Sequence, residues 1–139
     1  MQYVKPKAES HPFMHKRTNK RILAMLSDLF FTVKIGDAAR RVGMQVDFVK
    51  EEKEFLEKAQ SKPALIIIDL NVTGANPVKI VSKLKSDPDL RSISVLAYVS
   101  HVQGELKQKA HESGCDMVMA RSAFSQNLAQ ILKRHAGSN

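Results

Sequence analysis

Hydrophobic and polar residues follow two patterns along most of the chain: short apolar runs, and longer stretches with a helical repeat. The first apolar run, residues 21–26 (Arg-Ile-Leu-Ala-Met-Leu), is typical of a strand that is buried on both faces. In the next segment, residues 29–42, apolar residues from Ile35 to Val42 recur at helical spacing, and Gly43 provides a stop. These two segments predict a strand followed by a helix.

The same pair of patterns recurs four more times. Residues 64–70 (Ala-Leu-Ile-Ile-Ile-Asp-Leu) give the strongest strand signal, because they are rich in β-branched residues and follow Pro63. The next helix is predicted to begin with Asn76 as its N-cap and Pro77 in its first position, and to end before Asp87. The other predicted elements are strands at 44–48, 93–99 and 117–120, helices at 51–60 and 105–112, and a last helix capped by Ser122 or Ser125.

Five strand–helix units joined by short loops determine the predicted fold class. Strands that alternate with helices form a parallel sheet, and the helices must cover both of its faces. Right-handed crossover connections leave few topologies, of which the flavodoxin-like strand order 2-1-3-4-5 suits a chain of this size. We therefore predict an α/β fold of five βα units, with a five-stranded parallel sheet in that order, for residues 20–137.

The composition is that of one globular domain. The chain has 139 residues, of which 43% are hydrophobic and 26% are charged, and this hydrophobic content excludes a mainly disordered protein. The single cysteine, Cys115, permits no internal disulfide and favours a cytoplasmic location. No apolar run approaches the roughly 18 residues that a membrane span requires, so no span is expected.

Basic residues are concentrated at the beginning of the chain. The 22 Lys and Arg residues exceed the 14 Asp and Glu residues, and six of these bases lie within residues 1–21 beside the single acid Glu9. We interpret residues 1–19 as a basic, flexible N-terminal arm. An arm that contacts phosphates would make the protein a nucleic-acid-binding module. A solvated extension fits the composition better, because no aromatic or Arg-rich pattern accompanies the charge.

Candidate site residues are expected beyond the carboxyl ends of the strands, where ligands bind in a parallel sheet of this order. Asp69 is outstanding among them because it closes a run of three isoleucines, where a carboxylate is costly unless it is exposed or has a partner. Local backbone N–H groups are one source of such a partner. Its place in the third of five units favours a functional role.

Several segments resemble the receiver domain of response regulators, a signalling module that accepts a phosphoryl group on an aspartate from a histidine kinase. The resemblance extends from about Lys20 to His135. It places Asp69 at the position of the phosphoacceptor, and Asn71 where a backbone carbonyl binds Mg²⁺. The segments that carry it are Arg21-Ile-Leu, Pro63-Ala-Leu-Ile-Ile-Ile-Asp69-Leu-Asn71, Val95-Leu-Ala-Tyr98-Val99-Ser100-His101 and Ser113-Gly114-Cys-Asp116.

The metal site of that family is incomplete in this sequence. The acidic pair that binds Mg²⁺ at the end of the first strand corresponds to Leu26 and Ser27, and Asp28 follows one residue later. Because Mg²⁺ requires oxygen ligands, the carboxylates of Asp28 and Asp69 would support weak Mg²⁺ binding at most. We expect no resident metal and no other cofactor, since the five histidines and Cys115 also lack the spacing of a zinc site.

Two further positions depart from the receiver pattern. The hydroxyl residue that binds the phosphoryl group corresponds to Val99, and Ser100 after it points to the opposite face of a strand. The lysine after the fifth strand corresponds to Arg121, which keeps the charge and could pair with Asp69 but has a different geometry. The residues expected to support Asp69 are therefore Asp28, Asn71, Ser100 and Arg121.

These departures predict a stand-alone pseudo-receiver in a phosphorelay, not an enzyme, that acts through protein–protein contacts with impaired phosphorylation. Its partners would be signalling proteins, such as a histidine kinase or an effector, and a homodimer is a further option. The alternative is a working receiver that a histidine kinase phosphorylates on Asp69. The expected interaction surface is the face of the fourth helix, fifth strand and fifth helix, which receivers commonly use; here it would include Tyr98, Gln103, Lys107, His111, Met119 and Gln126.

Overall fold

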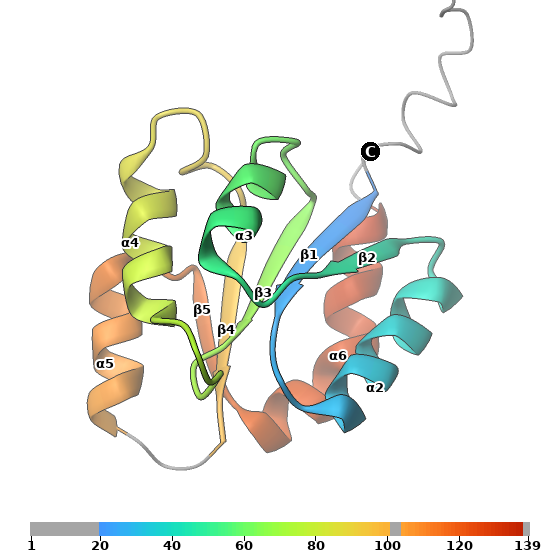
Figure 1. The fold of residues 1–139 in the computed structure, drawn as a ribbon. Helices are drawn as coiled ribbons and strands as arrows, with labels where there is room; N and C mark the ends of the chain where they lie inside the picture. Colours follow the sequence, from blue (N-terminus) through green and yellow to red (C-terminus); the bar gives the residue numbers. More distant parts are fainter. Residues whose placement is uncertain (1–19, 101–103, 138–139) are drawn as a thin grey trace, which may run out of the picture.

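The structure is a computed structural model that describes residues 20–100 and 104–137. Its five strands form one parallel sheet in the order β2-β1-β3-β4-β5, which confirms the predicted topology (Figure 1). In chain order the elements are β1 (Arg21–Met25), α2 (Leu29–Arg41), β2 (Gln45–Phe48), α3 (Glu52–Ala59), β3 (Leu65–Asp69), α4 (Pro77–Ser86), β4 (Val95–Val99), α5 (Gly104–Ser113), β5 (Met117–Ala120) and α6 (Arg121–Gly137).

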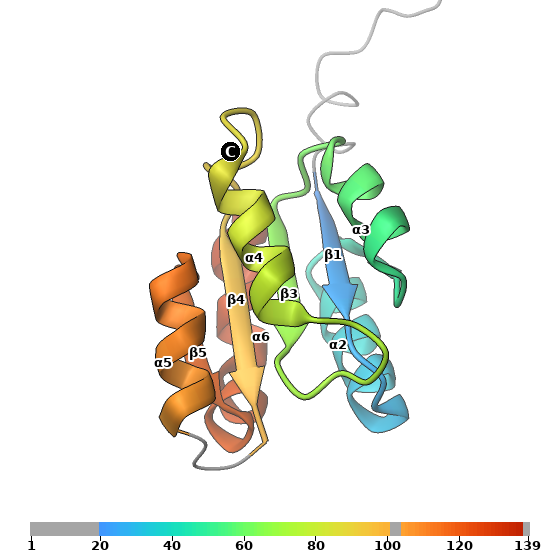
Figure 2. The same cartoon turned by 60° about the vertical axis from the view of Figure 1, so that its left-hand side comes forward.

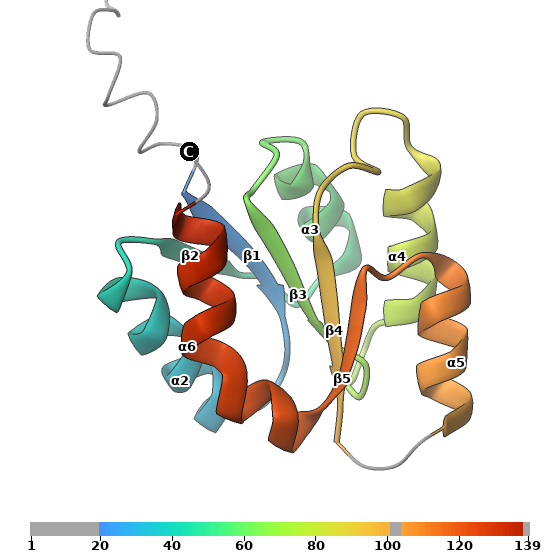
Figure 3. The same ribbon diagram turned by 180° about the vertical axis from the view of Figure 1, so that it is seen from behind.

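The helices form two layers, one on each face of the sheet. Helices α3, α4 and α5 cover one face (Figure 2), and α2 and α6 lie side by side on the other (Figure 3). Successive residues of β3 point to opposite layers: Leu65 and Ile67 pack with α2 and α6, whereas Ile66 and Ile68 pack with the other three helices. All five β3 residues are therefore buried, which explains the uninterrupted apolar run in the sequence.

Side-chain caps begin two of the helices. Asp28 is the N-cap of α2, and its Oδ1 accepts hydrogen bonds from the backbone N–H groups of Phe30 (2.8 Å) and Phe31 (3.3 Å). Asn76 is the N-cap of α4, as predicted, and accepts a bond from the Lys79 N–H at 3.1 Å. The Asp28 cap was not predicted, because its carboxylate had been considered only as a metal ligand.

The start of α6 differs from the prediction. The helix begins at Arg121, directly after β5, so neither Ser122 nor Ser125 is its N-cap. The preceding residue is Ala120, which has no side-chain acceptor, and the hydroxyl pattern was therefore a misleading start signal. The direct connection places Phe124 fully inside the α2 and α6 layer, a core residue that the helical pattern did not identify.

The two ends of the described chain meet at the amino edge of the sheet. Lys20 Nζ donates a hydrogen bond to the backbone carbonyl of Ala136 at 2.6 Å, which connects the residue before β1 to the last turn of α6. The predicted arm, residues 1–19, lies outside the described residues. In the ranges that the structure describes, no helix is both long and apolar enough to cross a membrane.

Gly114 lies directly beneath Lys85, in the turn between α5 and β5. Its φ is +110°, and a Cβ atom at this position would lie 2.8 Å from Lys85 Cγ. The lysine cannot easily move, because its Nζ donates to the carbonyls of Arg91 and Ile93 and to Asp116 Oδ2, each at 2.9 Å. Both the backbone angle and the space therefore require glycine.

Replacing Gly114 with alanine is expected to lower the free energy of unfolding by about 1 kcal/mol, since an L-residue is strained at this φ. Urea unfolding followed by circular dichroism measures the change. Gly36→Ala is the matched control: a Cβ there meets nothing within 4 Å, and the substitution should stabilise α2 by about 0.5 kcal/mol. Equal stability of wild type and Gly114→Ala would contradict the packing described for Lys85.

Candidate functional site at the carboxyl edge of the sheet

Asp69 is the last residue of β3 and lies beside Tyr98 of β4 in the parallel register. It is 8% exposed, and its Oδ1 accepts a hydrogen bond from the backbone N–H of Asn71 at 2.8 Å. Burial raises the pKa of the Asp69 carboxyl group, and the Asn71 hydrogen bond opposes part of that increase. Within the described ranges no ion pair reaches this carboxylate, so its partner is the local backbone.

Asn71 and Ser100 lie together next to Asp69. The Asn71 Oδ1 accepts two hydrogen bonds from Ser100, one from the backbone N–H at 2.8 Å and one from the hydroxyl at 2.9 Å. These bonds join the loop after β3 to the loop after β4. Three of the predicted site residues therefore form one connected group, in which the Ser100 hydroxyl is bound to Asn71.

Asp28 and Arg121 form a second group at the same edge. Their side chains make an ion pair that joins the N-terminus of α2 to the N-terminus of α6. The Arg121 guanidinium carbon also lies 4.7 Å from the centroid of the Phe31 ring. The expectation that Arg121 could pair with Asp69 is wrong in this structure, because the direct β5–α6 connection places its guanidinium over α2.

The donor atoms at this edge do not fit a Mg²⁺ site of the receiver type. Leu26, at one metal-binding position, is 3% exposed and belongs to the hydrophobic core. At the next position the Ser27 hydroxyl lies 3.4 Å from the Thr73 hydroxyl. Asp28 is occupied as a helix cap and ion-pair partner, and the described residues contain no cluster of three His, Cys, Asp or Glu side chains suited to a metal.

Tyr98 does not belong to the expected interaction surface. Its side chain is 1% exposed and stacks on Phe124, with ring centroids 4.6 Å apart and planes 8° apart. β4 is buried on both faces, so no residue of this strand can present a large side chain to a partner. Of the other residues predicted for that surface, Lys107, His111 and Gln126 are exposed and Met119 is half-buried, whereas Gln103 lies outside the described residues.

The raised pKa of Asp69 predicts a pH-dependent stability. A carboxyl group whose pKa is higher in the folded state costs stability once it ionises, so its contribution falls as pH rises from the unfolded value of 3.8 through the folded value. Asp69→Asn keeps an oxygen acceptor for the Asn71 N–H and should be more stable than wild type at pH 7 by about 1 kcal/mol. Urea unfolding between pH 4 and pH 7 should show this difference growing with pH; a difference that shrank would indicate a cationic partner for Asp69.

Comparisons with known proteins give structural matches for this chain but no sequence matches. No family model matches the sequence, and no curated protein matches it. The structure, in contrast, is similar to a signal receiver domain of a histidine kinase from Syntrophus aciditrophicus, with a TM-score of 0.73, 22% identity, and coverage of 84% of this chain and 89% of that one.

Two further structures show the same similarity. A chemotaxis response regulator of Vibrio cholerae matches with a TM-score of 0.70 and 19% identity over 83% of this chain and 97% of that one. The receiver domain of a sensor histidine kinase from Pseudomonas aeruginosa, which holds a magnesium ion coordinated in its active site cleft, matches with a TM-score of 0.72 and 18% identity over 86% of this chain and 99% of that one. With its strand order and its layers of helices, the chain has the fold of response-regulator receiver domains.

Proposed function

We propose that this chain is a receiver-type signalling domain that acts by binding other proteins and does not depend on phosphorylation of Asp69. The observation that carries the proposal is the pairing of Arg121 with Asp28. Phosphoryl transfer requires cationic groups that neutralise charge on the transferring oxygens. The guanidinium at this edge is already held by a carboxylate and by the Phe31 ring, away from Asp69.

The absence of a suitable metal site in the described residues supports the same proposal. Mg²⁺ would have to be held by Asp69 and the Asn71 loop, because Leu26 supplies no donor and Asp28 is engaged elsewhere. Ser100, the nearest hydroxyl residue after β4, donates to Asn71 instead of offering its proton to a bound anion. Asp69 would therefore face an incoming phosphoryl group without the charge neutralisation that the transfer requires.

A working phosphoacceptor is the second candidate, and one observation favours it. Asp69 keeps the strand-end position, its carboxylate accepts a hydrogen bond from the Asn71 N–H, and the Asn71 side chain in turn accepts one from the Ser100 backbone N–H. In this case Arg121 would have to leave Asp28 and turn toward Asp69 during the reaction. The two candidates therefore differ in what Arg121 does when Mg²⁺ and a phosphoryl mimic are added.

The test is a ¹H–¹⁵N NMR titration with Mg²⁺ and then with Mg²⁺ plus beryllofluoride, a phosphoryl mimic, on the wild type and on Asp69→Ala. We expect no selective change of the Asn71, Ser100 and Arg121 amide signals at millimolar Mg²⁺. A phosphorylatable receiver domain treated in parallel shows that the reagents are active. If these amides shift in the wild type and not in Asp69→Ala, the site accepts phosphoryl groups and the proposal fails.

A further inference from the structure

Several chain segments meet at the amino edge of the sheet, on the side opposite the candidate site. The Lys20 carbonyl accepts a hydrogen bond from the Gln45 N–H at 3.2 Å, and the Arg21 carbonyl accepts one from the Ala64 N–H at 2.8 Å. The Lys20 Nζ atom donates to the Ala136 carbonyl in the last turn of α6. The loop before β2, the loop before β3 and the end of α6 are therefore joined around the start of β1.

Basic side chains gather around this junction. Helices α2 and α6 lie side by side and both end at this edge of the sheet (Figure 3). Arg40 and Arg41 lie in the last turn of α2, Lys133 and Arg134 near the end of α6, and Lys62 in the loop before β3. All five are exposed, with side-chain exposures of 76% for Arg40 and 78% for Arg41. These five residues form a basic surface, which folding assembles from three distant parts of the chain.

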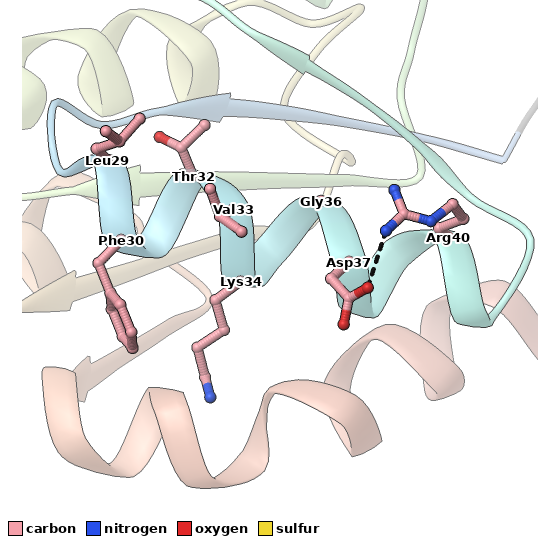
Figure 4. Close-up of a pocket in the computed structure, with 8 residues that line it drawn as sticks. All are labelled: Leu29, Phe30, Thr32, Val33, Lys34, Gly36, Asp37 and Arg40. Atoms are coloured by element: carbon pink, nitrogen blue, oxygen red, sulfur yellow. Dashed lines mark hydrogen bonds and ion pairs between the residues drawn. The ribbon is translucent and has the colours of Figure 1, made fainter.

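Carboxylates neutralise little of the basic surface. Asp37 is shared by Arg40, at 2.8 Å, and Arg41, at 3.1 Å, and the contact with Arg40 is drawn in Figure 4. The other three bases form no ion pair with any part of the chain that the structure describes. Asp47, the acid of the neighbouring strand β2, is bound to Arg21 at 2.8 Å. The basic surface therefore has five positive charges and one shared carboxylate.

Lys62 occupies a backbone conformation that normally selects glycine. Its φ is +56°, and no other non-glycine residue in ranges 20–100 and 104–137 has a positive φ. The corresponding loops before β2 and β5 contain Gly43, with φ +77°, and Gly114, with φ +110°. Strained positions of this kind often mark functional residues. What Lys62 adds over glycine is an exposed positive charge, beside the opposite charges of Glu57 and Lys58 at the end of α3.

The β4 and β5 half of the same edge has a different charge balance. The loops before β4 and β5 contain three acidic residues, Asp87, Asp89 and Asp116, and one base, Arg91. Lys85, the last base of α4, donates to Asp116, and its side chain is only 15% exposed. Positive charge is thus concentrated on the half of the edge formed by β2, β1 and β3, which sets the side from which a polyanion can approach.

The basic surface also lacks an apolar anchor. The exposed large apolar side chains of the described residues are Leu29, Phe30, Val33, Phe48 and Met117. The first three lie in the first two turns of α2 and Phe48 ends β2, all toward the carboxyl edge, whereas Met117 begins β5 at the other side of the sheet. Protein partners and inserted membrane anchors use apolar contacts. The phosphates of a nucleic acid require only positive charge.

We infer that the basic surface, formed by Arg40, Arg41, Lys62, Lys133 and Arg134, binds the phosphate backbone of a nucleic acid duplex without reading its sequence. Guanidinium groups contact phosphate oxygens in pairs, and lysines supply point charges. Packed helices lie about 8–10 Å apart, which is comparable with the roughly 6–12 Å widths of the grooves of a duplex. This inference goes beyond the proposed protein-binding function and does not depend on it.

The sequence of the arm agrees with this inference. Residues 1–19, which join the described domain at Lys20, contain four Lys and Arg residues and one acidic residue. Their attachment point lies within the junction that the basic surface surrounds. Composition alone favoured a solvated arm, because the five bases of the surface form no pattern along the chain and come together only in the fold.

The test is fluorescence anisotropy of fluorescein-labelled duplexes with the full chain. Two DNA duplexes of unrelated sequence and one RNA duplex, each of about 20 base pairs, give a site longer than the protein contact requires. We expect saturable binding, equal within about twofold for the two DNA sequences, and a slope of about −4 for the logarithm of the binding constant against that of the salt concentration. Tighter binding of the RNA duplex would identify RNA as the source of the phosphates.

Paired variants locate the contact. Lys133→Gln combined with Arg134→Gln should weaken DNA binding at least about fivefold at about 0.1 M salt and reduce the salt slope by about 1 to 2. Lys107→Gln combined with Lys109→Gln is the matched control, because it removes the same charge from exposed positions of α5 on the other face of the sheet. The affinity of this control should stay within about twofold of wild type, since salt screens charges that are farther away than about 10 Å.

Lys62→Gly separates binding from folding. Glycine adopts a positive φ without strain, so urea unfolding should show a variant at least as stable as wild type. Its affinity for the DNA duplex should nevertheless fall at least about twofold, because one phosphate contact is lost. Amide shifts of the ¹⁵N-labelled wild type should concentrate at the ends of α2 and α6 and in the loop before β3, a readout that depends on no variant.

The inference fails if affinity is insensitive to salt, if one DNA sequence is clearly preferred, or if the α5 control loses as much affinity as the α6 variant. An unchanged affinity in Lys62→Gly, or amide shifts centred on the carboxyl edge, would also overturn it. Polyglutamate and phosphatidylglycerol vesicles are compared with the duplex at equal concentrations of negative charge. Binding to either that is as tight as binding to the duplex would indicate a protein or a membrane partner and would overturn the inference.

Discussion

Replacing Asp28 with alanine will lower the free energy of unfolding by about 2 kcal/mol, because one carboxylate stabilises two helix starts. Its Oδ1 caps α2 through the Phe30 and Phe31 N–H groups, and its Oδ2 pairs with Arg121 at the start of α6. Loss of an N-cap costs about 1 kcal/mol. The ion pair is partly exposed, with side-chain exposures of 26% for Asp28 and 38% for Arg121, so it contributes about 1 kcal/mol at most.

Asp28→Asn separates these two contributions. An asparagine keeps the capping oxygen and removes the charge, so this variant should lose about half as much stability as Asp28→Ala. A double-mutant cycle with Arg121→Gln, measured by urea unfolding, then gives the interaction between the two side chains. Full additivity of Asp28→Asn and Arg121→Gln would show that the pair contributes nothing, and it would remove the main support for a guanidinium held away from Asp69.

Replacing Tyr98 with phenylalanine will raise the free energy of unfolding by about 2 kcal/mol. The Tyr98 hydroxyl is buried and has no hydrogen-bond partner among the described residues, so folding removes it from water without compensation. Burial raises the pKa of this phenol, and the Asp69 carboxylate raises it further, so the hydroxyl is neutral at pH 7. Phenylalanine keeps the stacking on Phe124 and removes only the unpaired group.

The matched control for that change is Tyr98→Leu, which removes the hydroxyl together with the aromatic ring. In the wild type the Tyr98 ring centroid lies 5.4 Å from that of Phe31. Leucine loses this aromatic contact, so Tyr98→Leu should lower the free energy of unfolding even though it too removes the unpaired hydroxyl. Thermal unfolding of both variants beside the wild type measures the effects. A destabilised Tyr98→Phe would show that the hydroxyl has a partner in solution, for example a bound water.

The fold could be predicted from the sequence because the pattern of each segment predicts the same element that the whole fold requires at that place. The buried run of β3 and the Asn76-Pro77 start of α4 each predict one element, and together the elements leave few strand orders, of which the observed one suits a chain of this size. The predicted ends differ from the observed ones by one or two residues. The start of α6 was predicted wrongly, because Ser122 and Ser125 suggested an N-cap whereas the helix begins at Arg121, directly after β5.

The candidate site was predicted only in part, for a physical reason. Strand ends can be located from the pattern, and this placed Asp69, Asn71 and Ser100 near one another. The direction of a side chain cannot be predicted in this way: Asp69 was considered as one possible partner of Arg121, whereas the structure pairs Arg121 with Asp28. The outer residues of α2 were missed because Leu29, Phe30 and Val33 fit an apolar helix pattern equally well whether they face the core or solvent.

The hydrogen bond between Lys20 and Ala136 has a consequence for how this domain can be attached to other molecules. It holds both ends of residues 20–137 at the amino edge of the sheet, whereas Asp28, Arg121 and the exposed Phe30 lie at the carboxyl edge. The chain therefore enters the described domain at Lys20 and leaves it at Gly137 on the side of the molecule opposite these residues, and neither connection point covers the carboxyl edge.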